Sequence, residues 1–175
     1  MNKLRRDLSP ELVSSMSSAL CEKLVSLPCF AECTDVFLYR AAFGEADPAG
    51  IAAAAKCLGK RTAYPVCFGE GIMEFYYASS DSDFREGIFH GIYEPDTSKC
   101  ELAVPSANNK VLLIVPGVAF GKDGRRLGRG GGYYDRYMEK YSGVLFKTAG
   151  FCYDFQITDD CPPAEAHDRA VDIVV

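Results

Sequence analysis

The spacing of apolar residues predicts a helix near the start of the chain. Ser9 can cap a helix, and Pro10 suits the first helical position, where its missing N–H costs nothing. The apolar positions that follow on one face are Leu12, Val13, Met16, Leu20, Leu24 and Leu27. We expect one amphipathic helix that begins at Ser9 and ends near Pro28.

Short apolar runs predict the strands. The uninterrupted run from Val111 to Val115 predicts a central strand that is buried on both faces. Further strands are expected at 36–39, 62–66, 73–77 and 144–152, with a final edge strand at 171–175. Helices are expected at 48–58 and 133–141, whereas the polar, Gly- and Pro-containing segment 79–110 predicts loops with a short helix at most.

The alternation of strands and helices predicts the fold class. Such alternation is typical of an α/β fold, and we expect a Rossmann-like, three-layer α/β/α sandwich around a mostly parallel sheet. No internal repeat or linker divides the sequence. A single domain over residues 1–175 is therefore predicted.

Charge and composition narrow the class of ligand. The formal net charge of -5 argues against a nucleic-acid or anionic-membrane binder, while local basic clusters at 3–6 and 122–129 favour a small anionic ligand. No apolar run approaches the roughly 20 residues of a membrane span, and no signal peptide is recognisable, so a cytoplasmic protein is expected. The eight cysteines form no CxxC pair and predict reduced thiols. We expect a small-molecule substrate and a monomer or weak homo-oligomer.

A glycine-rich segment lies between the strongest strand and the helix expected at 133–141. Its glycines are Gly117, Gly121, Gly124, Gly128, Gly130, Gly131 and Gly132. The last of them run directly into the helix, whose free N–H groups favour an anion, and Arg125, Arg126 and Arg129 can bind phosphate oxygens. The segment matches neither the P-loop nor the dinucleotide fingerprint, and a merely flexible or tight connection remains the alternative.

The order of residues in this segment resembles one enzyme family. Pro116-Gly117-Val118-Ala119-Phe120, followed by the run from Gly124 to Arg136, is similar to the signature of the 5-formyltetrahydrofolate cyclo-ligases. Weaker similarities occur at 44–47, 59–65, 91–95, 167–168 and 171–172. The resemblance implies conversion of 5-formyltetrahydrofolate to 5,10-methenyltetrahydrofolate with ATP and Mg²⁺, through phosphorylation of the formyl oxygen.

The resemblance also implies roles for individual residues. It assigns to ATP the residues Arg126, Leu127, Gly128, Arg129, Gly130, Gly131, Gly132, Tyr133 and Tyr134, with Lys3. It assigns to the folate the residues Glu45, Arg129, Gly130, Gly131, Gly132 and Tyr133. Arg129 and Tyr133 would be catalytic, Asp135 and Asp172 would bind Mg²⁺, and Glu94 is a weaker folate candidate.

Each of these residues also has a purely structural interpretation. Asp135 could favour the helix dipole, Glu45 and Asp172 could be solvated acids, and Tyr133 and Tyr134 could be core residues. For His90 and His167 we favour structural or supporting roles, with His167 and Asp168 orienting the segment that carries Asp172.

The sequence departs from the family pattern at both ends. Members usually begin with Lys-x-x-x-Arg well ahead of a Leu-Ser pair, whereas only seven residues precede Leu8 here. Lys3, Arg5 or Arg6 would have to serve the ATP phosphates instead. The chain also stops at Val175, before the usual Thr-Glu ending, which predicts a frayed last strand beside Asp172.

Two other functions remain open at this point. One is a nucleotide- or folate-binding protein with reduced or lost catalysis. The other is a sugar-phosphate isomerase or acyl-transfer protein on a similar scaffold.

Overall fold

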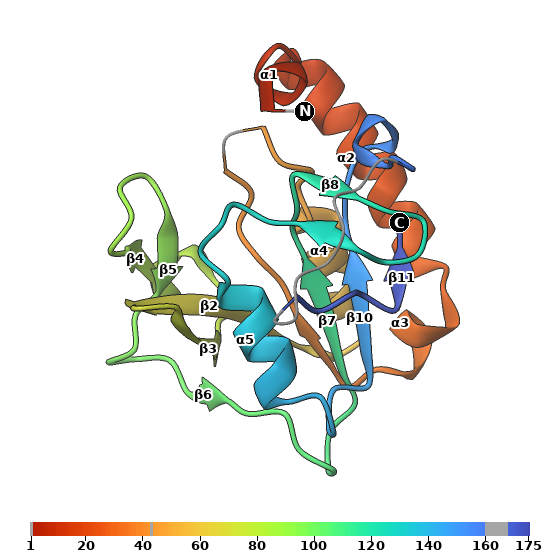
Figure 1. Cartoon of the computed structure of the whole chain (residues 1–175). Helices are drawn as coiled ribbons and strands as arrows, with labels where there is room; N and C mark the ends of the chain where they lie inside the picture. The colour runs from red at the N-terminus through yellow and green to blue at the C-terminus, as the bar shows by residue number, and fades with distance from the viewer. Residues whose placement is uncertain (1, 43, 160–167) are drawn as a thin grey trace.

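A computed structural model describes residues 2–42, 44–159 and 168–175, and it is built around one seven-stranded sheet (Figure 1). The strand order is β11-β10-β7-β1-β2-β3-β6. The strands are β1 (Asp35–Phe37), β2 (Arg61–Gly69), β3 (Ile72–Tyr77), β6 (Leu102–Ala103), β7 (Val111–Val115), β10 (Lys147–Gly150) and β11 (Ile173–Val174). Strands β11, β10, β7, β1 and β2 are parallel, and β3 and β6 add antiparallel pairs, which confirms the mostly parallel α/β fold.

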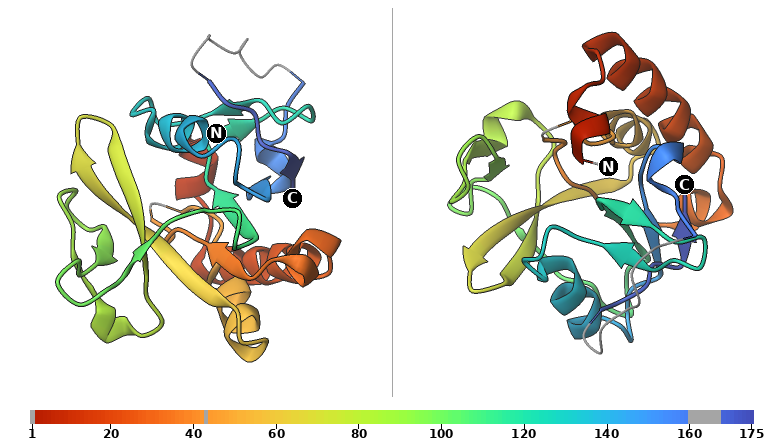
Figure 2. Two further views of the ribbon diagram at one scale, coloured as in Figure 1. Left: turned by 90° about the horizontal axis from the view of Figure 1, so that it is seen from below. Right: turned by 45° about the horizontal axis from the view of Figure 1, so that its top comes forward.

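Helices cover both faces of the sheet. Helices α2 (Pro10–Val25), α3 (Pro28–Glu32) and α4 (Ala49–Cys57) lie on one face, and α5 (Tyr133–Lys140) lies on the other (Figure 2). The side chains of β7 alternate between these layers. Leu112 and Ile114 pack against the first group of helices, while Leu113 and Val115 belong to the cluster that includes Tyr137 of α5. All five β7 residues are fully buried, as the apolar run predicted.

The N-terminal helices differ in part from the prediction. Ser9 caps α2 as expected, since its Oγ accepts a hydrogen bond from the N–H of Leu12 at 3.3 Å. The helix ends at Val25, however, and Pro28 occupies the first position of a separate helix, α3. A short helix α1 (Asn2–Arg6) was not predicted, because five residues are too few for a periodic pattern.

The segment 79–110 contains more structure than its composition predicted. It forms a two-stranded sheet from β4 (Phe84–Glu86) and β5 (Tyr93–Pro95), a 3₁₀ turn η1 (Asp81–Asp83) and the edge strand β6. Strands of two or three residues cannot show a period of two, which explains why the prediction of loops was wrong here. The strand expected at 144–152 is also shorter, because 144–146 turns before β10 begins.

The carboxyl ends of the parallel strands meet at one edge of the sheet. The segments after β1 and β7 both leave from that edge, and crevices at such edges hold the ligands of open α/β sheets. Among the described residues, no helix is long and apolar enough to cross a bilayer.

Candidate active site

The glycine-rich segment after β7 is folded rather than loose. Its first half forms a hairpin of β8 (Ala119–Phe120) and β9 (Arg126–Leu127), which the sequence did not predict. Gly124 closes this hairpin at φ +87°, and a Cβ there would lie 2.2 Å from the carbonyl oxygen of Val171. Gly132 precedes α5 in the left-handed conformation at φ 63°. Glycine at these two positions lets the chain turn and approach other backbone closely.

A cavity of about 900 Å³ lies beside this segment. Its walls include every proposed ATP or folate residue except Lys3, together with Asp135. The shared residues are Glu45, Arg126, Leu127, Gly128, Arg129, Gly130, Gly131, Gly132, Tyr133, Tyr134 and Asp135. Positions 45 and 126–135, far apart in sequence, are therefore brought to one cavity. Lys3 and Asp172 do not line it.

Glu45 and Arg129 form an ion pair within the cavity. Arg129 Nη2 lies 2.7 Å from Glu45 Oε1, and the Glu45 side chain is only 12% exposed. Its other oxygen accepts a hydrogen bond from the N–H of Ala42 at 3.1 Å. Burial raises the pKa of Glu45, and the charge of Arg129 opposes that rise. Glu45 is thus a largely desolvated carboxylate, not a solvated loop residue.

A second ion pair joins β9 in the glycine segment to the start of α5. Arg126 Nη2 lies 2.7 Å from Asp135 Oδ2, and the two side chains are 5% and 11% exposed. The other oxygen of Asp135 accepts a hydrogen bond from the N–H of Arg169. Within the described part of the chain, Nε of Arg126 is buried and has no hydrogen-bond partner. An arginine at the cavity wall with an unused donor is chemically suited to an anion.

The proposed metal ligands have different surroundings. Asp135 lines the cavity, but both of its oxygens have protein partners. Asp172 Oδ2 instead accepts hydrogen bonds from the N–H and the Oγ1 of Thr148, at 2.7 and 2.8 Å. The described ranges contain no group of three or more His, Cys, Asp and Glu residues placed to hold a metal. The structure therefore brings one of the two proposed ligands to the cavity.

Arg5 is an N-terminal basic residue that contacts a residue of the cavity wall, Gly117, although it does not line the cavity itself. Lys3 is exposed on α1, whereas Arg5 is 4% exposed and its Nη1 donates to the carbonyl oxygen of Gly117 at 3.3 Å. Burial lowers the pKa of Arg5, and the charge of Glu45 opposes that shift. The sequence offered Arg5 as one of three alternatives, and only the tertiary contact distinguishes it from its neighbours.

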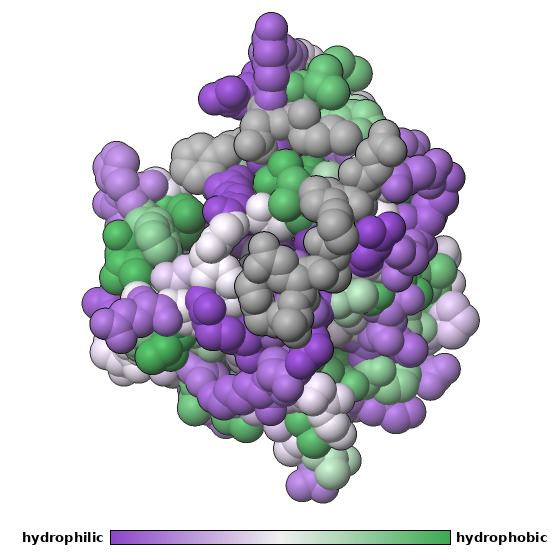
Figure 3. All heavy atoms as spheres, viewed as in Figure 1, coloured by the Kyte–Doolittle hydropathy of each residue, from purple (hydrophilic) through white to green (hydrophobic). Residues whose placement is uncertain are grey.

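The β4–β5 hairpin supplies the opposite wall of the cavity, and sequence reasoning largely missed it. The lining residues from this hairpin are Phe89, His90, Ile92, Tyr93 and Glu94. Several of them are also exposed on the hairpin, which is apolar at the left of Figure 3. The ring of Phe89 meets that of Tyr133 edge to face, with centroids 6.2 Å apart. His90 bonds Glu86 at 2.8 Å, and His167 lies outside the described residues.

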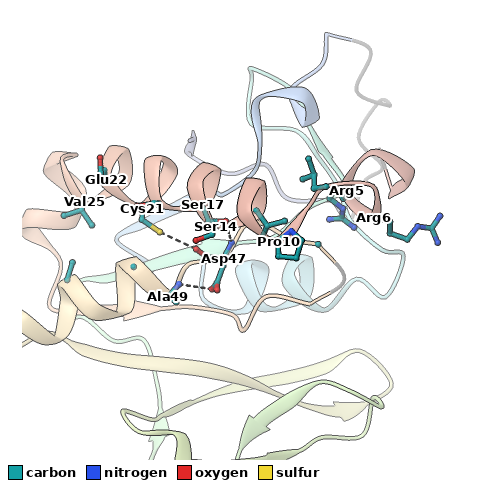
Figure 4. Close-up of a pocket in the computed structure, with 16 residues that line it drawn as sticks. Arg5, Arg6, Pro10, Ser14, Ser17, Cys21, Glu22, Val25, Asp47 and Ala49 are labelled. Atoms are coloured by element: carbon teal, nitrogen blue, oxygen red, sulfur yellow. Dashed lines mark hydrogen bonds between the residues drawn. The ribbon is translucent and has the colours of Figure 1, made fainter.

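A separate groove of about 870 Å³ lies between α2 and α4, with Arg5 and Arg6 at one end (Figure 4). Its polar groups bond to one another. Cys21 Sγ donates to the carbonyl oxygen of Asp47 at 3.4 Å, and Ser17 Oγ accepts from the N–H of Asp47 at 3.0 Å. These contacts join the helices, so we take the groove as a packing feature and the cavity beside the glycine segment as the candidate site.

Comparisons with known proteins all point to the same family. The chain matches the 5-formyltetrahydrofolate cyclo-ligase family over residues 1–175. A probable 5-formyltetrahydrofolate cyclo-ligase of Schizosaccharomyces pombe is 30% identical, across 100% of this chain and 90% of the relative. The Escherichia coli K12 5-formyltetrahydrofolate cyclo-ligase is 28% identical, across 92% of this chain and 88% of the relative.

Two solved structures share the fold. The 5,10-methenyltetrahydrofolate synthetase of Aquifex aeolicus has a TM-score of 0.78 at 31% identity, covering 99% of this chain and 84% of its own. The synthetase of Mycoplasma pneumoniae has a TM-score of 0.75 at 23% identity, covering 99% and 92%, and supports the fold alone. From the full-length match and these relatives, the chain belongs to the 5-formyltetrahydrofolate cyclo-ligase family.

Proposed function

We propose that this protein converts 5-formyltetrahydrofolate and ATP to 5,10-methenyltetrahydrofolate, ADP and phosphate, in a Mg²⁺-dependent reaction in the cytoplasm. The observation that carries the proposal is the shared cavity. The glycine segment at the start of α5, the guanidinium groups of Arg126 and Arg129, and the desolvated carboxylate of Glu45 all line it. The glycine segment and the two arginines suit an anion, whereas the carboxylate of Glu45 suits a ligand rich in N–H donors.

The ATP phosphates would lie against the glycine segment. Residues 128–132 have no side chains except at Arg129, and they lead into the N-terminus of α5, where backbone N–H groups have no helical partner. Arg126 and Arg129 would add charge-assisted hydrogen bonds to phosphate oxygens. Phosphoryl transfer depends mainly on positioning and charge neutralisation, and these groups supply both.

The pterin would lie against Glu45. A carboxylate can accept two parallel hydrogen bonds from the guanidine-like edge of a pterin. Arg129 binds one oxygen of Glu45, and the Arg129 side chain is 44% exposed, so it has room to turn towards a phosphate oxygen. Binding of the pterin edge and transfer of Arg129 to ATP would then occur together.

The steps of the proposed reaction are those that the family resemblance implies. The γ-phosphoryl group passes from ATP to the formyl oxygen, N10 attacks the formyl carbon and loses its proton, and phosphate leaves with that oxygen. Arg129 and Tyr133 are the proposed catalytic residues, because the resemblance assigns them to both ligands and both line the cavity. Arg126 and Arg129 would stabilise negative charge on the phosphoryl group as it moves.

Mg²⁺ would neutralise phosphate charge, and Asp135 is the carboxylate placed to bind it. Mg²⁺ commonly uses one or two protein carboxylates, with phosphate oxygens and water as its other ligands. A single carboxylate at the cavity wall is therefore enough, although Arg126 must share or release Asp135. That Asp172 joins it stays a prediction, since Thr148 now holds its carboxylate.

Incubation of the purified protein with 5-formyltetrahydrofolate, ATP and Mg²⁺ tests the proposal. We expect the absorbance of the 5,10-methenyl product to appear together with equimolar ADP. Folded protein that binds both ligands without forming product would instead support the alternative of a binding protein without catalysis.

A further inference from the structure

A short turn after β10 contacts both segments that carry the proposed ligand residues. It is the 3₁₀ turn η2 (Asp154–Gln156), which follows β10 at the edge of the sheet where β1 and β7 also end. Tyr153 directly precedes this turn, and Gln156 is its last residue. The two residues are 0% and 1% exposed, respectively. The reaction described above gives neither of them a part.

Gln156 is bound to the start of the glycine segment. Its side-chain Nε2 donates hydrogen bonds to the carbonyl oxygens of Gly117 and Val118, at 2.9 and 3.0 Å. Its Oε1 accepts a hydrogen bond from the N–H of Tyr153 at 3.2 Å. Both N–H groups and the oxygen of this amide therefore have partners, as a buried polar side chain requires. The side chain of Gln156 joins the turn after β10 to the turn after β7.

The backbone that Gln156 holds is in contact with an arginine of the cavity wall. Gly117 lines the cavity, and the carbonyl oxygen of its neighbour Pro116 accepts a hydrogen bond from Nη1 of Arg126 at 3.5 Å. A Cβ at Gly117 would lie 3.2 Å from Cγ of Arg126 and 2.5 Å from the ring of Phe120. The turn at Gly117 and the Arg126 side chain are thus packed together, so a shift of the turn would move the guanidinium.

Tyr153 is bound to the segment that carries Glu45. Its hydroxyl donates a hydrogen bond to the backbone carbonyl oxygen of Glu45 at 3.2 Å. The N–H of Gln156 also donates to the carbonyl oxygen of Tyr153 at 2.8 Å, so these two residues bind each other in both directions. One turn therefore connects the carboxylate proposed for the pterin with the glycine segment proposed for ATP.

The separation of these two segments matters for the proposed reaction. ATP would lie against the glycine segment and the pterin against Glu45, so the distance from the phosphoryl group to the formyl oxygen depends on how far apart the segments lie. A misplacement of about 1 Å between reacting groups can lower a rate about 10²-fold. Gln156 and Tyr153 hold both segments from behind, since neither residue lines the cavity.

We propose that Gln156 and Tyr153 are positioning residues of the active site, which hold the Glu45 segment and the glycine segment at the separation that phosphoryl transfer requires. The inference rests on the proposed function, which places the two substrates on these segments. The alternative is that both residues only stabilise the fold. Positioning changes the kcat of the folded enzyme, whereas stabilisation changes the fraction of protein that is folded.

Replacement of Gln156 by methionine removes its three side-chain hydrogen bonds and keeps a side chain of similar length. We expect kcat per folded molecule to fall about 10- to 100-fold in Gln156→Met. The Kd values of ATP and of 5-formyltetrahydrofolate, each measured alone, should stay within about threefold of the wild-type values, because a ligand bound alone needs no alignment with the other. The folded fraction is taken from urea unfolding.

Replacement of Tyr153 by phenylalanine tests the other end of the connection and removes only a hydroxyl group. We expect kcat to fall about 3- to 10-fold in Tyr153→Phe, as is typical of losing one neutral hydrogen bond. Tyr77→Phe is the matched control, because the Tyr77 hydroxyl donates to Asp35 Oδ1 at 2.6 Å, at the start of β1 on the opposite edge of the sheet. That variant should unfold at a lower urea concentration and keep the wild-type kcat.

Two kinetic results overturn the inference. One is a kcat within about twofold of the wild-type value in folded Gln156→Met, and the other is a loss of kcat in Tyr77→Phe as large as that in Tyr153→Phe. If Gln156→Met does not fold, Tyr153→Phe decides between the two roles. An unchanged kcat in that variant assigns both residues to stability alone, and a fall beyond that of Tyr77→Phe supports positioning.

Hydrogen exchange provides a readout that does not need turnover. The amides of Val118 and Glu45 donate hydrogen bonds to backbone carbonyl groups, at 2.7 and 3.2 Å. We expect faster exchange of the Val118 amide in Gln156→Met and of the Glu45 amide in Tyr153→Phe, and of neither in Tyr77→Phe. Wild-type protein that forms no product contradicts the proposed reaction. Unchanged exchange of both amides overturns the positioning role, whether or not the wild type is active.

Discussion

Arg129 Nη2 lies 2.7 Å from Glu45 Oε1, so a residue of the glycine segment is bound to a residue 84 positions earlier in the chain. Glu45 is assigned to the pterin of the folate, whereas Arg129 is assigned to the phosphates of ATP as well as to the folate. Their contact means that the charge of each group depends on the other.

Removal of Arg129 should therefore change the pH dependence of folate binding. Glu45 must be ionised to accept two N–H donors. Burial already raises its pKa, and Arg129 is the largest influence that lowers it. In Arg129→Gln the pKa of Glu45 rises further, so folate affinity should be lost at a higher pH as the solution is acidified. The measurement is the KM for 5-formyltetrahydrofolate as a function of pH in the wild type and in Arg129→Gln. If the KM rises at the same acidic pH in both proteins, Arg129 does not influence the ionisation of Glu45.

The same variant should be impaired in catalysis. Loss of a donor that stabilises developing charge typically lowers kcat by about 10²- to 10³-fold. Arg125→Gln is the matched control, because Arg125 binds Asp123 at 2.7 Å on the outside of the β8–β9 hairpin and does not line the cavity. An equal loss of kcat in the two variants would argue that Arg129 acts only through the net positive charge of the segment and not through a specific hydrogen bond.

Asp135 should matter for folding as well as for Mg²⁺. In Asp135→Asn the buried guanidinium of Arg126 loses its counter-charge, and breaking a buried ion pair in this way costs about 3–5 kcal/mol. We expect a lower free energy of unfolding in urea and, under conditions where the variant is folded, a weaker dependence of ATP binding on Mg²⁺.

Asp172→Asn provides the comparison for Asp135. Asp172 is exposed, and its carboxylate binds Thr148, so a loss of about 1 kcal/mol is expected. If Asp172 is also a Mg²⁺ ligand, its variant will shift the Mg²⁺ dependence of ATP binding as well. If only Asp172→Asn shifts it, the metal has been assigned to the wrong carboxylate.

Arg5 should contribute more to the site than its neighbours on α1. Arg5→Met removes a buried positive charge close to Glu45 and the hydrogen bond to Gly117, so we expect about a tenfold rise in the folate KM. Arg6→Met changes the exposed residue next to it and should have little effect. A larger loss of ATP affinity in Lys3→Met than in Arg5→Met would support the sequence-based assignment of Lys3 to ATP and contradict the greater role of Arg5.

The outcome at α1 illustrates what the sequence could and could not predict. The uninterrupted run at Val111 and the cap at Ser9 are local signals, and both were confirmed. The family resemblance assigned Glu45 and residues of the glycine segment to one substrate, and the structure shows that they line one cavity. The burial of Arg5, in contrast to the exposed Lys3, accompanies the packing of α1 against Gly44, where a Cβ would lie 2.6 Å from the carbonyl oxygen of Arg5. Such a long-range contact leaves no periodic pattern in the sequence.

The part of the cavity wall formed by β4 and β5 also depends on long-range contacts that the sequence does not reveal. Glu94 precedes a proline in a polar segment, and nothing local distinguishes a turn residue from a cavity residue there. Glu94 is buried and accepts a hydrogen bond from the N–H of Cys67, 27 positions away, a contact that only the folded chain shows. The partners of Asp135 and Asp172 were likewise hidden, because Arg126 and Thr148 reach them only once the sheet and α5 are assembled.

Gly71 should influence ATP binding although it does not line the cavity. Arg136 of α5 donates hydrogen bonds to the carbonyl oxygens of Gly71, at 3.0 Å from Nε, and of Gly131 in the glycine segment. A Cβ at Gly71 would lie 1.6 Å from Nη2 of Arg136 and would displace its guanidinium. The glycine segment would then lose the contact that fixes its carbonyl group.

We expect Gly71→Ala to lower the free energy of unfolding by about 1–3 kcal/mol and to raise the KM for ATP. Gly69→Ala in the same turn is the control. Its φ of +84° carries similar strain, but no atom lies within 4 Å of the added Cβ, so ATP affinity should not change. In an Arg136→Met background, Gly71→Ala should cost only the strain and leave the KM for ATP where Arg136→Met alone puts it. Additive effects of the two substitutions on that KM would show that Gly71 and Arg136 act independently of each other.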